Sequence, residues 1–266
     1  LVNLAGEMIA FDSRSLRMGA SESDLLDTID GLLNKMIALA PAAVAGVGIG
    51  SIGPILADQG LILSPHFSAL EGLNIPEHIQ KKYGLPVSLQ IGAVAAAYGE
   101  ERIAKQQHRS ANSVAFVVLD YAGIGLGLIS GGVGWISDHG GIGELGHVSI
   151  DLNGRQCDCG RRGCLQQYAS GRAMLRALGH PEDRDQGATL ARIAQNAEEG
   201  DEAAQAALLD AGEYLGHGLA DVDHLLRPER IVLGSSHPKL ADWYLRGAYR
   251  YIDRLPEARG GRTLRD

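Results

Sequence analysis

The sequence predicts an α/β protein with small residues packing helices on a sheet. Segments with strand periodicity alternate along the chain with segments that have helix periodicity. The 266 residues include 36 glycines, which suit the tight turns between such elements. Aromatic residues make up only 5% of the chain, as expected where alanine-rich helices pack closely.

The first half of the chain alternates between these two kinds of element. The opening residues 1–11 are predicted to form two short strands around the turn Ala5-Gly6-Glu7. Ser21 begins a helix, because Ser21 to Asp24 resembles a capping box and apolar residues then recur at helical spacing. The other predicted elements are a buried strand at 45–50 leading to Gly53-Pro54, a helix at 74–83, a strand at 87–89 and an alanine-rich helix at 93–106.

The second half follows the same pattern after a polar, basic stretch. Residues 102–112 are expected to cross the surface, so the sequence predicts two α/β domains, residues 1–105 and residues 106–266. Apolar runs at 114–119 and 124–129 flank a glycine-bearing turn and predict a hairpin. Later helices are expected at 171–178, 189–199, 202–226 and 238–251, with a buried strand at 230–233.

Composition excludes several classes of protein. A hydrophobic content of 45% and a mean hydropathy of −0.03 are typical of a globular protein. A formal charge of −8 and a pI near 5.6 disfavour a broad nucleic-acid-binding surface, which needs clustered Lys and Arg. No apolar run approaches the length that spans a membrane, and we expect a cytoplasmic protein.

All three cysteines and one histidine fall between residues 147 and 164. Thiolates and a neutral imidazole are preferred ligands of tetrahedral Zn²⁺, and Gly160 and Gly163 allow the tight backbone that brings three sulfurs together. The alternatives are chance placement of small apolar residues, or a disulfide that leaves one odd thiol; a bond from Cys157 to Cys159 would close a strained ring. The run favours a closed, structural zinc site formed by His147, Cys157, Cys159 and Cys164.

Three blocks of sequence, in a fixed order, carry a family resemblance. Residues 143–147 read Gly-Glu-Leu-Gly-His, residues 157–164 follow Cys-x-Cys-Gly-x-x-Gly-Cys, and residues 165–172 read Leu-Gln-Gln-Tyr-Ala-Ser-Gly-Arg. In this order they resemble the signature of the ROK family, which comprises repressors, uncharacterised reading frames and sugar kinases. Shorter matching pieces lie at 46–50, 53–54, 84–87, 93–100 and 231–234.

The resemblance implies a particular architecture. ROK membership implies an actin-like, hexokinase-like ATPase fold, in which two ribonuclease-H-like domains close over a sugar and a nucleotide. It also implies zinc ligation by His147 and the three cysteines. The family's first phosphate-binding strand, of Asp-x-Gly-Gly-Thr type, is expected before Leu1, so the first domain lacks it here. Any winged-helix DNA-binding domain is likewise expected to lie outside these residues.

The family contains both ATP-dependent hexose kinases and sugar-responsive transcription regulators. Phosphoryl transfer to a sugar needs a carboxylate that accepts the hydroxyl proton. In kinases of the family this base lies in an Asn-Asp-Ala-Asn-Ala-Ala-Ala stretch, which here reads Ile-Gly-Ala-Val-Ala-Ala-Ala at 91–97. Gly92 stands at the position of the aspartate, and Glu100 is about two helical turns further on. Kinase activity is therefore not expected.

The phosphate-binding loops of the family are also altered. A Gly-Thr-Gly turn is replaced by Leu-Asp-Tyr-Ala-Gly-Ile-Gly at 119–125, where Asp120 would repel a triphosphate, and the later Gly-Gly becomes Gly-Ser-Ser at 234–236. Without the family, the glycine pattern at 123–127 favours a plain hairpin over phosphate binding. ATP and Mg²⁺ are accordingly not expected as cofactors.

The resemblance implies that the sugar-binding side is partly kept. Glu144 and His147 would face sugar hydroxyls, since a carboxylate and an imidazole can bind a vicinal diol. Gln166 replaces the family's glutamate after Gly-Cys-Leu, and His66 replaces its asparagine after proline. A carboxylate in solvent and a loop histidine are the alternatives for Glu144 and His66. For His147, zinc ligation ranks above sugar contact, although one ring nitrogen can serve each role.

Three other features have plainer interpretations. A metal site at His217, Asp221, Asp223 and His224 is less favoured than a solvated helix face. Trp135 is expected to pack inside the protein, and Arg161-Arg162 to form a solvated turn.

Together these features predict the effector-binding and oligomerisation body of a ROK-type transcription regulator, structured by zinc and without kinase activity. A sugar or sugar derivative near Glu144 and His147 would favour one angle between the domains. The protein is expected to be a homodimer or homotetramer, to make no membrane contact and to reach DNA only through another segment. The alternatives are a glucokinase-like, ATP-dependent hexose kinase with a degenerate active site, and a sugar sensor without a DNA role.

Overall fold

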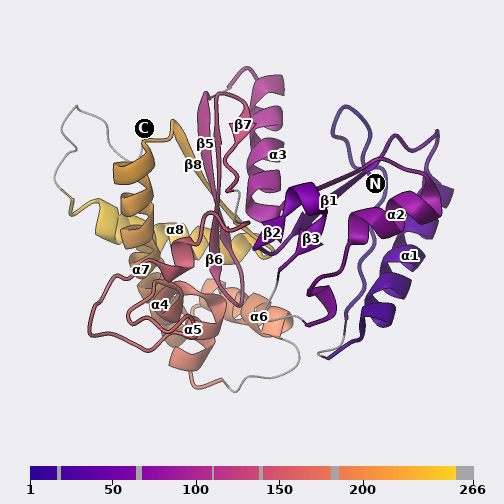
Figure 1. Ribbon diagram of the computed structural model, residues 1–266. Helices are drawn as coiled ribbons and strands as arrows, with labels where there is room; N and C mark the ends of the chain where they lie inside the picture. The colour runs from indigo at the N-terminus through magenta and orange to yellow at the C-terminus, as the bar shows by residue number, and fades with distance from the viewer. Residues whose placement is uncertain (17–18, 64–67, 110, 138–139, 181–185, 256–266) are drawn as a thin grey trace.

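The computed structural model describes residues 1–16, 19–63, 68–109, 111–137, 140–180 and 186–255 (Figure 1). These residues contain three β-sheets. The first pairs β1 (Val47–Ser51) in parallel with β4 (Val87–Ile91), and the second is a short antiparallel pair, β2 (Ile55–Leu56) and β3 (Leu61–Ile62). The third has the order β7-β6-β5-β8, with β5 (Ser113–Leu119), β6 (Ile124–Ser130), β7 (Val133–Gly134) and β8 (Arg230–Ser235). The mixed α/β class is confirmed.

Two capped helices cover the first sheet. The predicted capping box of α1 (Glu22–Leu39) is present, since Ser21 Oγ accepts from the Asp24 N–H at 3.1 Å and the Asp24 carboxylate accepts from the Ser21 N–H at 3.0 Å. The Asn74 side chain caps α2 (Ile75–Tyr83). The buried Asp30 of α1 joins the two helices, because it accepts hydrogen bonds from Lys82 at 2.7 Å and from the Tyr83 hydroxyl at 3.0 Å.

Two expectations for the first half are wrong. The segment at 45–50 is not a buried strand: β1 begins at Val47, and its residues alternate between half-buried and exposed because, in the described part of the chain, it pairs only with β4. The opening residues do not form two strands, and a single antiparallel bridge joins Val2 to Met8. The Asn3 side chain orders this turn instead, since its Oδ1 accepts from the backbone of Ala5 and Glu7, both at 2.9 Å.

The third sheet contains the predicted hairpin. β5 and β6 pair from Ser113↔Ser130 to Leu119↔Ile124, and β8 adds to β5 in parallel. The residues of β8 are half-buried, not buried as predicted. Helices on this part of the chain are α4 (Gln166–Ala169), α5 (Gly171–Ala177), α6 (Gln186–Glu198), α7 (Glu202–Leu226) and α8 (Pro238–Ile252).

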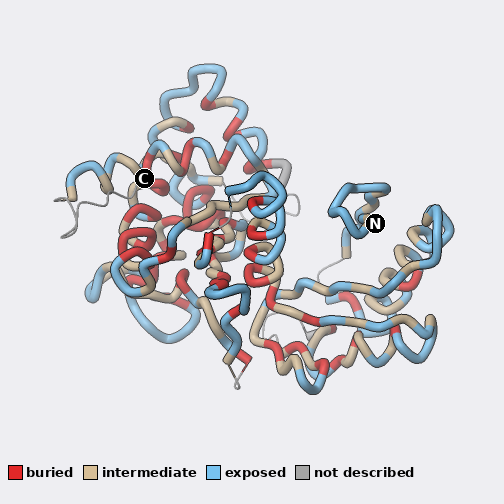
Figure 2. The backbone as a smooth tube through the Cα atoms, turned by 90° about the horizontal axis from the view of Figure 1, so that it is seen from above, coloured by how far each residue is buried: buried red, intermediate tan, exposed pale blue. Residues whose placement is uncertain are grey.

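The apolar core divides into two clusters, which Figure 2 shows as red segments. The larger cluster lies between β5, β6 and the helices α4 to α8, and the smaller one lies under α2, β1 and β4. Trp135 belongs to neither, because its exposed fraction is 48%; the expectation that it packs inside is wrong. Among the residues described, no helix has both the length and the apolar character needed to cross a membrane.

Helix α3 (Gly92–Gln106) connects the first sheet to the third. It begins directly after β4, and its first turn lies against β6: a Cβ on Gly127 would stand 2.1 Å from the carbonyl oxygen of Ala93. Further along, the Tyr98 hydroxyl accepts a hydrogen bond from the Gly134 N–H at 2.6 Å. The stretch from 102, which was expected to start a surface crossing, is still helical as far as Gln106. The position of Gly92 is therefore fixed between two sheets.

Candidate metal centre

The cysteine-containing loop begins at the short 3-10 helix η3 (Leu145–His147) and ends at α4. Isolated bridges join Ser149 to Cys164 and Gln156 to Arg162, and they fold the loop back on itself. Gly163 has a φ of +68°, and a Cβ there would lie 1.6 Å from the carbonyl oxygen of Asp151. Only glycine fits this position, and the tight turn that it permits brings Cys164 back beside η3.

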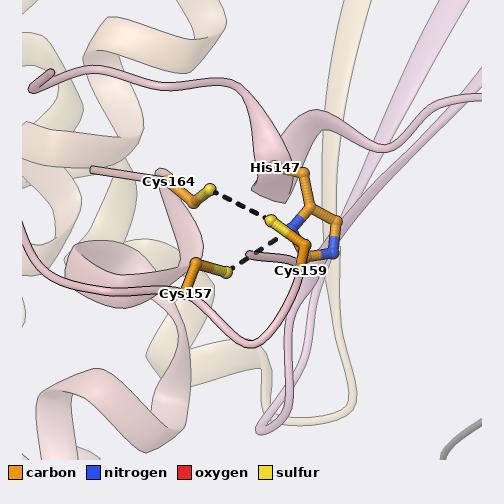
Figure 3. A group of neighbouring side chains, drawn as sticks. All are labelled: His147, Cys157, Cys159 and Cys164. Atoms are coloured by element: carbon orange, nitrogen blue, oxygen red, sulfur yellow. Dashed lines mark hydrogen bonds between the residues drawn. The ribbon is translucent and has the colours of Figure 1, made fainter. Parts of the chain in front are cut away.

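The structure brings together the four side chains proposed as zinc ligands (Figure 3). Their ligand atoms all lie within 4.8 Å of one another; Cys157 Sγ is 3.6 Å from His147 Nδ1, and Cys159 Sγ is 3.6 Å from Cys164 Sγ. All three cysteines are free thiols. A tetrahedral ion with Zn–S bonds of about 2.3 Å holds its sulfurs about 3.8 Å apart, whereas a disulfide needs about 2.0 Å. The separations fit shared coordination of one ion.

The electrostatics of the sulfurs favour a cation between them. Burial opposes ionisation of Cys157, but hydrogen bonds from the Cys159 N–H, from Gln167 and from the other two thiols outweigh it and lower the pKa of Cys157 to about 6. Burial and the neighbouring thiols raise the pKa of Cys164 to about 12, because a second negative charge beside the first is unfavourable. A bound cation removes this penalty, so the donor set fits a divalent metal ion.

A layer of side chains around the loop holds the sulfurs in place. Gln167 is buried and points its Nε2 at Cys157 Sγ from 3.5 Å. The Arg155 guanidinium lies 4.6 Å from the centre of the Tyr168 ring, and the Arg155 N–H donates to the Tyr168 hydroxyl at 2.8 Å. Tyr168 packs in turn against Tyr214 of α7, with ring centres 4.8 Å apart. These contacts anchor the cysteine-containing loop, called the metal loop below, to α4 and α7.

The two arginines of the predicted solvated turn are exposed but bonded. Arg161 donates to the His147 carbonyl at 3.4 Å, and Arg162 donates to the Gly154 carbonyl at 3.1 Å. Both hydrogen bonds join one part of the loop to another, and the sequence alone gave no sign of this role.

The residues predicted to face a sugar lie beside the sulfur cluster. Glu144 immediately precedes η3, its side chain is 58% exposed, and its Oε2 is 3.9 Å from His147 Nε2. The ring of His147 therefore presents Nδ1 to Cys157 (Figure 3). Its Nε2 faces Glu144. This is the arrangement that a double role of His147 requires.

The other two predicted ligand-binding residues have different outcomes. Gln166 is half-buried, its Nε2 lies 3.6 Å from Cys157 Sγ, and its Oε1 lies 3.3 Å from where a Cβ on Gly123 would stand. Its amide therefore connects the hairpin turn to the sulfurs. His66 lies outside the described residues. Sequence reasoning missed Gln167, Tyr168 and Tyr214; the only available signal was their position next to the cysteine run or on the facing helix.

The expectation of a solvated helix face around His217 is only partly right. The His217 ring stacks on Tyr251 of α8 at 3.7 Å, and burial lowers the pKa of this imidazole. Asp223 is buried and pairs with Arg227 at 3.2 Å, while His224 Nδ1 bonds the Ala220 carbonyl at 2.7 Å. These side chains are used separately, and the described residues form only one metal-type cluster, the one at His147.

Position 92 lies at the start of α3, and the hairpin turn lies against the start of α5. Gly92 starts α3, and the first turn of that helix contains no acidic residue. The N-terminus of α5 is occupied: the Gly171 N–H donates to the Asp120 carbonyl at 3.3 Å, and the Arg172 N–H donates to the Tyr121 carbonyl at 2.8 Å. These donors are therefore not free to hold an anion.

The model of the ROK family matches residues 1–246. This chain belongs to the ROK family. The resemblance inferred from the cysteine block and its flanking residues is thereby confirmed.

ROK relatives of both functional classes are similar to this chain. It is 30% identical over 239 residues to the xylose repressor of Bacillus subtilis, a match that covers 89% of the chain and 60% of the repressor. It is also 30% identical over 251 residues to an N-acetylmannosamine kinase of Escherichia coli O127:H6, covering 93% of the chain and 82% of the kinase. The chain thus spans 60% of the length of the xylose repressor that it matches.

Solved ROK structures confirm the hexokinase-like fold. A ROK glucokinase from Streptomyces griseus in complex with glucose and AMPPNP superposes with a TM-score of 0.78 at 25% identity, covering 95% of this chain and 84% of the glucokinase. A ROK transcriptional regulator, a homologue of the Escherichia coli Mlc protein, superposes with a TM-score of 0.70 at 28% identity, covering 87% of this chain and 60% of the regulator.

Proposed function

We propose that this chain is the effector-binding and oligomerisation part of a ROK transcription regulator that has no kinase activity. The observation that carries the proposal is Gly92 at the start of α3, in a first turn without any acidic residue. A sugar kinase needs a group there that accepts the proton of the attacking hydroxyl. The similarity to xylose repressors supports the same conclusion.

The proposed effector is a sugar or sugar derivative bound at Glu144 and His147, with Gln166 at the edge of the site and His66 as a further contact. The exposed carboxylate of Glu144, 3.9 Å from His147 Nε2, supports this, because the two groups can share a pair of hydroxyls. Sequence similarity to proteins named for xylose makes pentoses the first class to test.

Zn²⁺ is the proposed ion at His147, Cys157, Cys159 and Cys164. When bound, it supplies the positive charge that keeps the sulfurs deprotonated. Four protein ligands leave no position for a catalytic water, so the proposed role is structural. Coordination through Nδ1 fixes the His147 ring and leaves Nε2 directed at Glu144.

The proposed response to the effector is a shift between two arrangements of the domains, 1–105 and 106–266. Helix α3 leaves the first sheet at Ile91 and packs on β6 at Gly127. A sugar that contacts residues on both sides of this helix would select one arrangement. The signal would pass to DNA through a segment outside residues 1–266. The proposed assembly is a homodimer or homotetramer, and light scattering can measure its mass.

Two assays on the purified chain test this proposal. Calorimetry with a panel of pentoses, hexoses and N-acetylhexosamines is expected to show binding that weakens in Glu144→Gln. A coupled ADP assay with ATP and the same sugars is expected to show no turnover. ATP-dependent phosphorylation of any of these sugars, abolished by Glu144→Gln, contradicts the proposal.

A sugar kinase is the second candidate function. Two observations favour it: the similarity to an N-acetylmannosamine kinase and the TM-score of 0.78 with a glucokinase that binds glucose and AMPPNP. Under this alternative another group replaces the missing carboxylate, and the ADP assay with N-acetylmannosamine and glucose decides between the two functions.

A further inference from the structure

The sulfurs of the metal cluster differ in their access to solvent. Cys157 and Cys164 are 2% and 0% exposed, whereas Cys159 is an exposed residue. The amide groups of Gln166 and Gln167 also cover Cys157 Sγ, at 3.6 Å and 3.5 Å. An oxidant that diffuses from solvent therefore reaches Cys159 first.

The Sγ atom of Cys164 lies 3.6 Å from the Sγ atom of this exposed thiol. A disulfide of about 2.0 Å requires the two atoms to approach by about 1.6 Å. Cys159 can make this movement, because Gly160 follows it and has no neighbouring atom within 4 Å of its Cβ position. Cys164 is held by its bridge to Ser149 and by the tightly packed Gly163.

We propose that Cys159 is a peroxide-sensitive modification site, whose oxidation joins it to Cys164 through a disulfide and releases the metal ion. The inference rests on the proposed metal site and adds a control on it. A bond from Cys159 to Cys157 is disfavoured, because these residues are separated by one residue and would close a strained ring.

Hydrogen peroxide is the oxidant. The Cys159 thiolate attacks one peroxide oxygen, so that an S–O bond forms as the O–O bond breaks, and hydroxide leaves. The Cys164 thiolate then attacks the Cys159 sulfur; an S–S bond forms, the S–O bond breaks and a second hydroxide leaves. Each sulfur loses one electron and each peroxide oxygen gains one. Only His147 and Cys157 remain as ligands, and two ligands do not retain a tetrahedral ion.

Release of the ion would affect the proposed sugar contacts at His147 and Glu144. His147 Nδ1 faces Cys157, and the Arg161 guanidinium on the moving segment bonds the His147 carbonyl. Oxidation therefore loosens the imidazole whose other nitrogen faces Glu144. Effector binding becomes sensitive to peroxide, while the larger apolar cluster that includes residues of α4 stays folded.

The test uses the Zn²⁺-loaded chain, treated with peroxide in the presence of a chromogenic chelator. About one equivalent of metal per chain is expected to be released. Digestion at arginine and at aspartate separates the sulfurs, because Arg161 and Arg162 lie between Cys159 and Cys164 and Asp158 lies between Cys157 and Cys159. Mass spectrometry is expected to find peptides 158–161 and 163–172 cross-linked, and dithiothreitol to reverse the link.

Two matched variants identify the reactive pair. Cys159→His replaces the exposed sulfur ligand by a nitrogen ligand and is expected to retain its metal under the same peroxide dose. Cys157→His keeps the pair and is expected to release metal. If either variant fails to bind Zn²⁺, the peptide map of the original chain decides whether Cys159 and Cys164 are the reactive pair.

Three results separate the two proposals. Metal release without a cross-link, or a cross-link that involves Cys157, overturns the inference. A chain that binds no Zn²⁺ refutes the proposed metal site, and in that case the peptide map still tests the Cys159–Cys164 disulfide by itself.

Discussion

Substitution of Gly163 by alanine tests how the metal loop is held. Gly163 has a φ of +68°, and a Cβ there would lie 1.6 Å from the carbonyl oxygen of Asp151. Gly160, in the same loop, has a φ of +84° but no atom within 4 Å of its Cβ position. The pair separates two effects, since Gly160→Ala introduces backbone strain alone and Gly163→Ala adds steric overlap.

The size of each effect follows from these contacts. The left-handed backbone costs a residue with a Cβ about 1–2 kcal/mol, which applies to both variants. Displacing the Asp151 carbonyl adds about 1–3 kcal/mol in Gly163→Ala, the usual range for overpacking. If the metal-free loop relaxes, metal affinity falls about 5-fold to 150-fold further in Gly163→Ala than in Gly160→Ala.

Competition of each variant with a chelator of known affinity measures this difference, and urea unfolding with the metal bound provides an independent reading. Circular dichroism is the control, because both variants should keep the helices α4 to α8 of the larger apolar cluster. Equal losses of affinity in the two variants would refute the reasoning, since the overlap at position 163 would then carry no cost.

Three further predictions concern other parts of the chain. Gly92→Asp is expected to fold, because the nearest atom to its Cβ position is the Ser51 carbonyl oxygen at 3.4 Å. The added carboxylate should stabilise α3 by about 0.3–1 kcal/mol in thermal unfolding. The variant should still release no ADP with ATP and sugars, and restored turnover would contradict the importance of the altered phosphate loops. Asp30 is buried, which opposes its charge, but Lys82, His78 and Tyr83 lower its pKa below the usual 3.8. Its stabilisation is therefore present above pH 3.8 and is lost as the pH falls through the lowered pKa, so Asp30→Asn should flatten the loss of urea stability below about pH 4; an unchanged slope would contradict this. Removal of the metal by a strong chelator should lower the thermal midpoint and expose the cysteines to alkylation, whereas unchanged protection would exclude a role of the metal in holding the loop.

Sequence patterns sufficed where the decisive contacts are local. The start of α1 follows from Ser21 and Asp24, which are three residues apart, and the β5–β6 hairpin follows from two apolar runs with a glycine turn between them. The sulfur cluster is similar, because its ligands lie close together in the chain and residue chemistry restricts what can bind there. Gly163 already indicated the tight turn.

Features that depend on distant segments could not be predicted. The partner of His217, Tyr251, lies 34 residues away on another helix, and the exposure of β1 depends on which strands pair with it. The use of the α5 N-terminus depends on the approach of the 120–121 carbonyls. Gln166 resembled a sugar ligand by position, but its contact with Cys157 depends on how the loop folds beneath α4.

The orientation of the His147 ring has a consequence for the polarity of the proposed sugar site. With a cation on Nδ1, the remaining hydrogen of the neutral ring resides on Nε2, which can then only donate. Glu144, 3.9 Å away, can only accept when it is ionised. A hydroxyl satisfies both neighbours, a fluorine atom at the same carbon satisfies only the imidazole, and hydrogen satisfies neither. Matched hydroxy, fluoro and deoxy analogues of one sugar should therefore bind in that order.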